Sequence, residues 1–183
     1  TAAPTDAPTD APTDAPTDAP TDAPTDAPTD APTYAVGGDC VLTLGAGDTG
    51  AAYSRSDIKN VLWIGSQADL DAVGAAVAGC TDGWRLAGGG LWVRGTRDVE
   101  DLAPLRHLTA IEGKDSSWGY SLFLRFNDNL VSVAALGRLR GALPGGLWVS
   151  DNPKLAGLEG LEGIDGVGRS GSGESVYIGS NGA

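Results

Sequence analysis

Residues 121–136 read SLFLRFNDNLVSVAAL, and this stretch holds the pattern that decides the fold. Its triplet Leu122-Phe123-Leu124 alternates aliphatic, aromatic and aliphatic side chains, which is typical of a β-strand. The same pattern occurs at four other places, and the five triplets are spaced by 29, 31, 25 and 29 residues: Leu62-Trp63-Ile64, Leu91-Trp92-Val93, Leu147-Trp148-Val149 and Val176-Tyr177-Ile178. A repeat of about 20–50 residues indicates units that stack on one another.

The repeats predict a mainly β fold, a parallel β-solenoid of about five coils over residues 58–183. Short helical turns are expected at 68–79, 98–109 and 131–140. A polar residue stands three positions after each triplet, and we expect these residues to form a ladder in the turns: Gln67, Thr96, Asn127, Asn152 and Asn181. An Asn amide can bond the backbone of the adjacent coil. Gln and Thr do this less well, so the first two coils should be less regular.

Three stretches follow the pattern L-x-x-L-x-L-x-x-N in whole or in part: SLFLRFNDNLVSVAAL, GLWVSDNPKLAGLEGLEGI at 146–164 and SVYIGSNGA at 175–183. The chain therefore resembles leucine-rich-repeat proteins, and most of all the variant found in cell-surface receptor L domains, over roughly residues 58–183. The resemblance implies a right-handed solenoid of long coils and an extracellular binding or scaffolding module, not an enzyme. The chain departs from the family in its 28 glycines, in the missing Asn of the first two coils and in lacking a recognisable C-terminal cap.

Residues 1–33 form a separate tract that begins with TAAP and continues with seven copies of TDAP. Proline at every fourth position fixes the backbone, and no bulky apolar side chain is available to bury, so we expect an extended polyproline-II-like segment. Composition alone indicates a disordered spacer; the alternative is a tract held by neighbouring chains or by attached sugars. Thr beside Pro in an Ala-rich run resembles the stalks of mucin-like and algal wall proteins, which implies O-glycosylation at Thr5, Thr9, Thr13, Thr17, Thr21, Thr25 and Thr29.

The charge of the chain excludes some partners. The net charge is −12, of which −7 lies in the tract, and all 12 Lys and Arg residues lie beyond it. No basic stripe is present, so we expect no nucleic-acid partner. No apolar run approaches the roughly 20 residues that cross a bilayer, so we expect no membrane span.

Cys40 and Cys80 are the only cysteines. Cys40 lies in the segment 34–57, which we expect to form an N-terminal cap, and Cys80 ends the first coil. A disulfide between them would close a loop of about 40 residues and contribute roughly 3–4 kcal/mol. The alternative is two buried free thiols; a secreted chain favours the disulfide.

The central residues of the triplets form an aromatic row: Trp63, Trp92, Phe123, Trp148 and Tyr177. Because side chains alternate along a strand, this row points away from the aliphatic core. Such a row is either an interface or a second core covered by other chain segments. On the interface interpretation, the proline-rich tract or glycans of another subunit lie on the row. Replacing Trp92 and Trp148 together with Ala would then abolish assembly and leave the fold intact.

These patterns favour an extracellular or cell-surface structural glycoprotein, not an enzyme, that assembles with copies of itself into a filament. Its partners would be itself and its covalent glycans, with carbohydrate as a further candidate. The alternative is a stalked, L-domain-like ectodomain that binds carbohydrate or a protein ligand. The two readings differ in oligomeric state and in the use of the aromatic row.

Other motifs are weak, and we expect no catalytic residues, cofactor or metal. Residues 45–50, GAGDTG, match G-x-G-x-x-G but lack a following βαβ unit, so a glycine-rich turn is favoured over a nucleotide site. His107 is the only histidine, which leaves a zinc site or a His-dependent nucleophile without support. The acidic residues at 98–101, and Asp128 with Asp151, lack the ligand spacing of a calcium loop.

Overall fold

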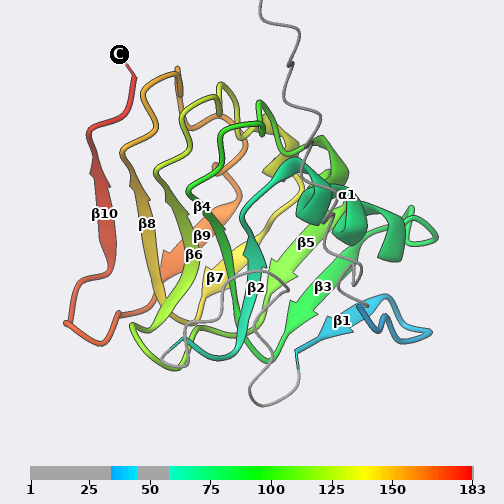
Figure 1. Ribbon diagram of the computed structural model, residues 1–183. Helices are drawn as coiled ribbons and strands as arrows, with labels where there is room; N and C mark the ends of the chain where they lie inside the picture. Colours follow the sequence, from blue (N-terminus) through cyan, green and yellow to red (C-terminus); the bar gives the residue numbers. More distant parts are fainter. Residues whose placement is uncertain (1–33, 45–57, 183) are drawn as a thin grey trace, which may run out of the picture.

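The computed structural model describes residues 34–44 and 58–182, and this part of the chain is mainly β with parallel sheets and little helix (Figure 1). The O-glycosylation candidates, the GAGDTG motif and most of the predicted cap lie outside these residues. The elements in chain order are β1 (Val41–Thr43), β2 (Val61–Ile64), α1 (Gln67–Ala76), β3 (Trp84–Ala87), β4 (Gly90–Arg94), η1 (Ala103–Leu105), β5 (Leu108–Ile111), β6 (Tyr120–Arg125), η2 (Ala134–Leu136), β7 (Gly141–Leu143), β8 (Gly146–Ser150), β9 (Ile164–Val167) and β10 (Val176–Gly179).

The five triplets form one parallel sheet in the order β10-β8-β6-β4-β2. Their central residues are paired across neighbouring strands in an unbroken register from Trp63 through Trp92, Phe123 and Trp148 to Tyr177. The predicted alignment of the triplets as adjacent strands is therefore confirmed. The repeat length varies in the connections between strands, so the different spacings leave the register of the triplets intact.

The remaining strands form two smaller parallel sheets, β1-β3-β5 and β7-β9. In Figure 1, β7 and β9 lie behind the large sheet, and β1, β3 and β5 are seen to the right of β2. From β2 onward the chain alternates between the two layers, because each even-numbered strand belongs to the large sheet and each odd-numbered strand to a small one. The sequence predicted helical turns for this back layer. Helical structure is present as α1, η1 and η2, but β3, β5, β7 and β9 were missed.

The main core fills the space between the layers. The aliphatic members of the triplets, such as Leu62, Leu91 and Leu122, pack there with Leu86 and Leu108 from the back layer, and all five are fully buried. Burial of a leucine side chain stabilises a fold by about 2 kcal/mol. The apolar periodicity of the sequence therefore corresponds to one continuous core.

Helix α1 begins at Gln67 because Ser66 caps it. The Ser66 hydroxyl accepts a hydrogen bond from the Asp69 N–H at 3.2 Å, and the Asp69 carboxylate accepts from the Gly65 N–H and the Ser66 hydroxyl. The Gln67 amide donates to Asp71 along the helix. The prediction that Gln67 belongs to the turn ladder is wrong, because the capped helix starts where the turn would otherwise lie.

Cys40 and Cys80 form a disulfide, with their Cα atoms 5.7 Å apart, so the predicted pairing is confirmed. The bond joins the segment before β1 to the segment that follows α1. Strand β1 also pairs with β3 in parallel, from Val41 opposite Arg85 to Thr43 opposite Ala87. The first small sheet is thus held to the rest of the fold by both a covalent bond and a strand pairing.

Candidate functional site

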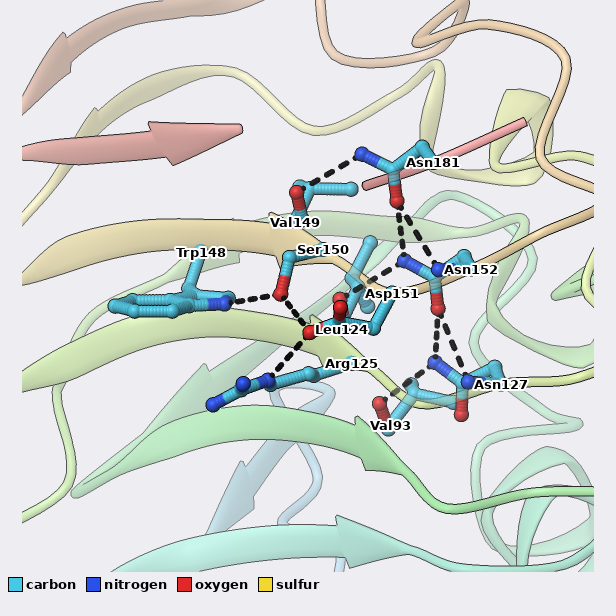
Figure 2. A network of polar contacts seen from close by, with 10 residues as sticks. All are labelled: Val93, Leu124, Arg125, Asn127, Trp148, Val149, Ser150, Asp151, Asn152 and Asn181. Atoms are coloured by element: carbon cyan, nitrogen blue, oxygen red, sulfur yellow. Dashed lines mark hydrogen bonds and ion pairs between the residues drawn. The ribbon is translucent and has the colours of Figure 1, made fainter. Parts of the chain in front are cut away.

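The turns that follow the strands of the large sheet share a ladder of side-chain amides (Figure 2). The Asn127 amide nitrogen donates to the Asn152 side-chain oxygen at 2.9 Å, and the Asn152 amide nitrogen donates to that of Asn181 at 2.9 Å. Thr96 joins at the other end, because its hydroxyl donates to the Asn127 oxygen at 2.9 Å. Four of the five predicted ladder residues are therefore brought together, and they fix the turns that border the outer face of the sheet.

One residue before each ladder position, the backbone is left-handed. Gly95, Phe126, Asp151 and Ser180 have φ angles of 73°, 59°, 56° and 54°. Glycine adopts this region freely, whereas a bulky side chain does so only at an energetic cost. Phe126 is therefore the unusual member of the series.

The aromatic row grades from buried to exposed along the sheet. Trp63, Trp92 and Phe123 are at most 6 % exposed, whereas Tyr177 is 41 % exposed and Trp148 is intermediate. Of the two alternatives for the row, a covered core is the one that applies to its first three members, which belong to a second core cluster, so the interface interpretation is wrong for them. Only Trp148 and Tyr177 keep substantial exposed surface.

A loop before β6 covers the buried part of the row. The Asp115 carboxylate, itself buried, accepts hydrogen bonds from the backbone N–H groups of Ser117, Trp118 and Tyr120. This turn places the Trp118 ring 5.2 Å from the Trp92 ring. The triplet pattern describes the strands alone, so it could not predict that this loop covers part of the row.

A first pocket, which we name the Trp148 pocket, lies on the outer face beside this loop. It has a volume of about 320 Å³ and is lined by Ser117, Trp118, Tyr120, Phe123, Arg125, Trp148, Gly171 and Ser172. The Trp148 ring stacks on Tyr177 with centroids 4.0 Å apart and meets Tyr120 edge-on at 5.5 Å. Aromatic walls with a few polar groups are typical of small-molecule sites.

Hydrogen bonds hold the Trp148 indole and the Arg125 guanidinium of this pocket in place (Figure 2). The Trp148 indole N–H donates to the Ser150 hydroxyl at 2.6 Å, and that hydroxyl donates to Asp151 at 2.8 Å. Arg125 Nε donates to the same Asp151 oxygen at 2.8 Å. The hydrogen bonds from Ser150 and Arg125 hold the pKa of Asp151 below its usual value, so the carboxylate stays ionised at neutral pH.

The Arg125 guanidinium has donors left for a ligand. Its carbon lies 5.2 Å from the centre of the Trp148 ring and 4.2 Å from that of Phe126, so it is held between two aromatic side chains. Within the described residues its two Nη groups make no hydrogen bond, because only Nε is used by Asp151. Because Arg125 lines the Trp148 pocket, its Nη groups are candidate donors to a ligand there.

A second pocket, the Phe126 pocket, is lined in part by the Phe126 ring. It has a volume of about 440 Å³ and is lined by Trp63, Gly65, Ser66, Asp69, Arg94, Gly95 and Phe126. The Arg94 guanidinium carbon lies 5.9 Å from the Trp63 ring centre and 5.8 Å from that of Phe126.

The Asp69 carboxylate of this pocket also acts on Tyr34. Burial is the larger cause and the Asp69 charge the smaller cause that together raise the pKa of Tyr34 to about 12.

Sequence reasoning identified the row but missed Trp118, Arg94, Arg125 and Phe126. A signal for the two arginines was available, because each directly follows a triplet, and the two are paired across β4 and β6.

Within residues 34–44 and 58–182, no group of three or more His, Cys, Asp or Glu side chains is placed to hold a metal. His107 contacts Arg138, with 2.8 Å between Nδ1 and Nη1. No helix in the same part of the chain is both long and apolar enough for a membrane span.

Comparison with known proteins gives one match. Residues 1–34 match the family model described as the PT disordered repeat, in agreement with the predicted repeat tract. No curated protein and no solved structure matches the chain.

Proposed function

We propose that this chain is an extracellular, non-enzymatic carbohydrate-binding module with an L-domain-like, right-handed solenoid fold, carried on an extended O-glycosylated tract. The observation that carries the proposal is the Trp148 pocket, where a partly exposed aromatic ring and the Arg125 guanidinium, whose Nη groups bond no described residue, meet in a fixed arrangement. The Cys40–Cys80 disulfide is compatible with a secreted chain. The tract would hold the pocket away from the surface to which the protein is attached.

The parallel register of the triplets and the asparagine ladder support the solenoid reading. Each repeat contributes one strand to the large sheet, and four ladder residues bond consecutive turns. In leucine-rich repeats, this position of the pattern is likewise an Asn or Cys. The strands of the two small sheets would then be the part of each coil that runs along the back of the solenoid.

The pocket chemistry favours an uncharged sugar. One face of a pyranose ring carries only C–H bonds, which can lie on the Trp148 ring, and its hydroxyl oxygens can accept from the Arg125 Nη groups. The charge of Arg125 is balanced by Asp151 at 2.8 Å, and the whole chain carries a net charge of −12, so an anionic ligand has no electrostatic advantage. A neutral pyranose fits both the aromatic and the polar walls.

Replacing Trp148 with Ala should weaken sugar binding at least about tenfold, because the ring face on which the sugar stacks is removed. Binding would be measured by a glycan array followed by calorimetry with the neutral sugars that bind. The matched control is Val131→Ala, which alters an exposed apolar side chain that lines neither pocket.

A synthetic peptide of TDAP repeats serves as the competing ligand in the same assay. Absence of sugar binding, or equal binding by W148A and V131A, would contradict the proposal. Binding of the TDAP peptide in place of sugars would assign the pocket to the tract of another copy, as in the filament reading.

Self-assembly into a filament is a second candidate, and the exposure of β10 favours it. Val176, Tyr177 and Ile178 are 41–51 % exposed, and no described strand pairs with the outer edge of β10. Such edges accept strands of other chains. The four residues of β2, at the other end of the sheet, are buried. Pairing of two β10 edges would close a dimer, so a filament needs a second contact, which the tract would supply on a neighbouring subunit.

Ile178→Lys should dissociate any such assembly, because it places a charge on the edge strand. The measurement is sedimentation velocity of the full chain over a range of concentrations, with Val131→Lys as the control at another exposed valine. A wild-type chain that stays monomeric, or an assembly that I178K leaves unchanged, would rule out this edge as the contact.

A further inference from the structure

We infer that Phe126 is a ligand-binding residue and that the Phe126 pocket is a second sugar subsite, so that the ligand is an oligosaccharide that spans both pockets. This inference rests on the proposed function, because it extends the Trp148 pocket along the same face. Three independent features of Phe126 carry it: its backbone, its exposure and its position.

The backbone of Phe126 is in a conformation that its side chain disfavours. Its φ angle is 59°, and the equivalent positions of the other turns hold Gly95, Asp151 and Ser180, which are small or can bond their own backbone. A bulky residue in this region is strained, and such strain is found where the side chain has a separate task. Folding alone would be served better by Gly at this position.

Burial does not explain the phenylalanine either. The residue is 41 % exposed, although a ring of this size stabilises a fold mainly by leaving water. Its described contacts are with two guanidinium groups, 4.2 Å from Arg125 and 5.8 Å from Arg94. The ring therefore packs against two cations that line the pockets and presents its remaining surface to solvent.

The position of the ring joins the two pockets. Arg125 lines the Trp148 pocket, while Arg94 lines the Phe126 pocket, and the Phe126 ring contacts both. Trp118, a wall of the first pocket, lies 5.8 Å from Arg94 of the second. The two pockets are therefore neighbours on one face, and a chain of at least two sugar units reaches from one into the other.

The Phe126 pocket repeats the chemistry of the first. Trp63 and Phe126 supply aromatic walls, Arg94 supplies a guanidinium, and the Asp69 carboxylate is held in place by hydrogen bonds of 3.0 Å from the Gly65 N–H and 2.9 Å from the Ser66 hydroxyl. The exposed Phe126 ring matches the C–H face of a second pyranose, and the charged groups that line the pocket match its hydroxyl groups.

The test compares one sugar unit with four. Calorimetry would measure the affinity for a monosaccharide of the glucose, mannose, galactose or xylose series and for its linear tetrasaccharide. For the wild-type chain we expect the tetrasaccharide to bind at least about tenfold more tightly, since the second unit adds its own contacts without a second loss of freedom. In Phe126→Gly this ratio should fall to near one, and Phe126→Tyr should retain it.

Stability separates a binding role from a packing role. F126G should unfold at the same or a higher urea concentration than the wild type, because Gly accepts φ of 59° without strain. Retention of the tetrasaccharide advantage by F126G, or a lowered urea midpoint, would overturn the inference. If the wild-type chain binds monosaccharides through Trp148 but shows no gain with the tetrasaccharide, the second subsite fails while the proposed function stands. If neither sugar binds, the proposed function fails first.

Discussion

Replacing Asn152 with Ala is expected to lower the free energy of unfolding by about 4 kcal/mol. Asn152 is fully buried, and its side chain accepts from the Asn127 N–H and amide and donates to the Leu124 carbonyl and to Asn181. The substitution leaves the buried Asn127 backbone N–H without an acceptor among the described residues, and takes one hydrogen bond each from the Asn127 amide, the Leu124 carbonyl and Asn181. A buried polar group left without its partner costs about 1–3 kcal/mol, and the other lost bonds add to this. The measurement is urea unfolding followed by tryptophan fluorescence.

The matched control is Asn181→Ala at the end of the same ladder. Asn181 makes equivalent bonds to Val149 and Asn152 but is only partly buried, so water can replace its partners. We expect a loss of about 1 kcal/mol. Equal losses for N152A and N181A would show that the ladder contributes through its location in a turn and not through the satisfaction of buried polar groups.

Replacing Trp92 with Ala should also cost about 4 kcal/mol of unfolding free energy. The side chain is fully buried and packs on Phe123 at 4.5 Å, Trp118 at 5.2 Å and Trp63 at 5.7 Å between ring centres. Alanine would leave a cavity between the large sheet and the loop that covers it. Calorimetric or urea unfolding would measure the loss.

Two variants bracket this effect. Trp92→Phe should cost less, because no described residue accepts a hydrogen bond from the Trp92 indole N–H, so none of these bonds is lost. Tyr177→Ala, at the exposed end of the row, should cost less than about 1 kcal/mol. A W92A variant as stable as Y177A would contradict the burial of the row. The double replacement of Trp92 and Trp148, considered from the sequence as a test of assembly alone, would therefore damage the fold.

The sequence was sufficient to predict the large sheet, because its signal is local and repeated. Each triplet carries its own alternation, and Asn127, Asn152 and Asn181 stand at the same distance from their triplets. The back layer lacks such a signal. Its strands have only three or four residues, and the register of β3 with β5 and of β7 with β9 is irregular. Short strands of this kind are specified by what they pack against.

The site was predictable only in part for a similar reason. Alternation placed five aromatic residues on one face but could not tell how much of that face is covered. Coverage depends on Asp115, which organises the loop that carries Trp118. The two missed arginines become informative only when β4 and β6 lie side by side and the Phe126 ring is seen between their guanidinium groups.

The asparagine ladder has a direction, because its two ends are chemically different. Asn127 and Asn152 each receive hydrogen bonds from the preceding turn and give them, from the backbone N–H and the amide, to the next. At Asn181 the oxygen is engaged, but no described residue accepts from its backbone N–H. A segment that packs on this end must place an acceptor oxygen opposite the Asn181 backbone N–H, since a purely apolar surface would bury that N–H without a hydrogen bond. A segment that packs on the Asn181 turn would thus be selected by hydrogen-bond polarity as well as by shape.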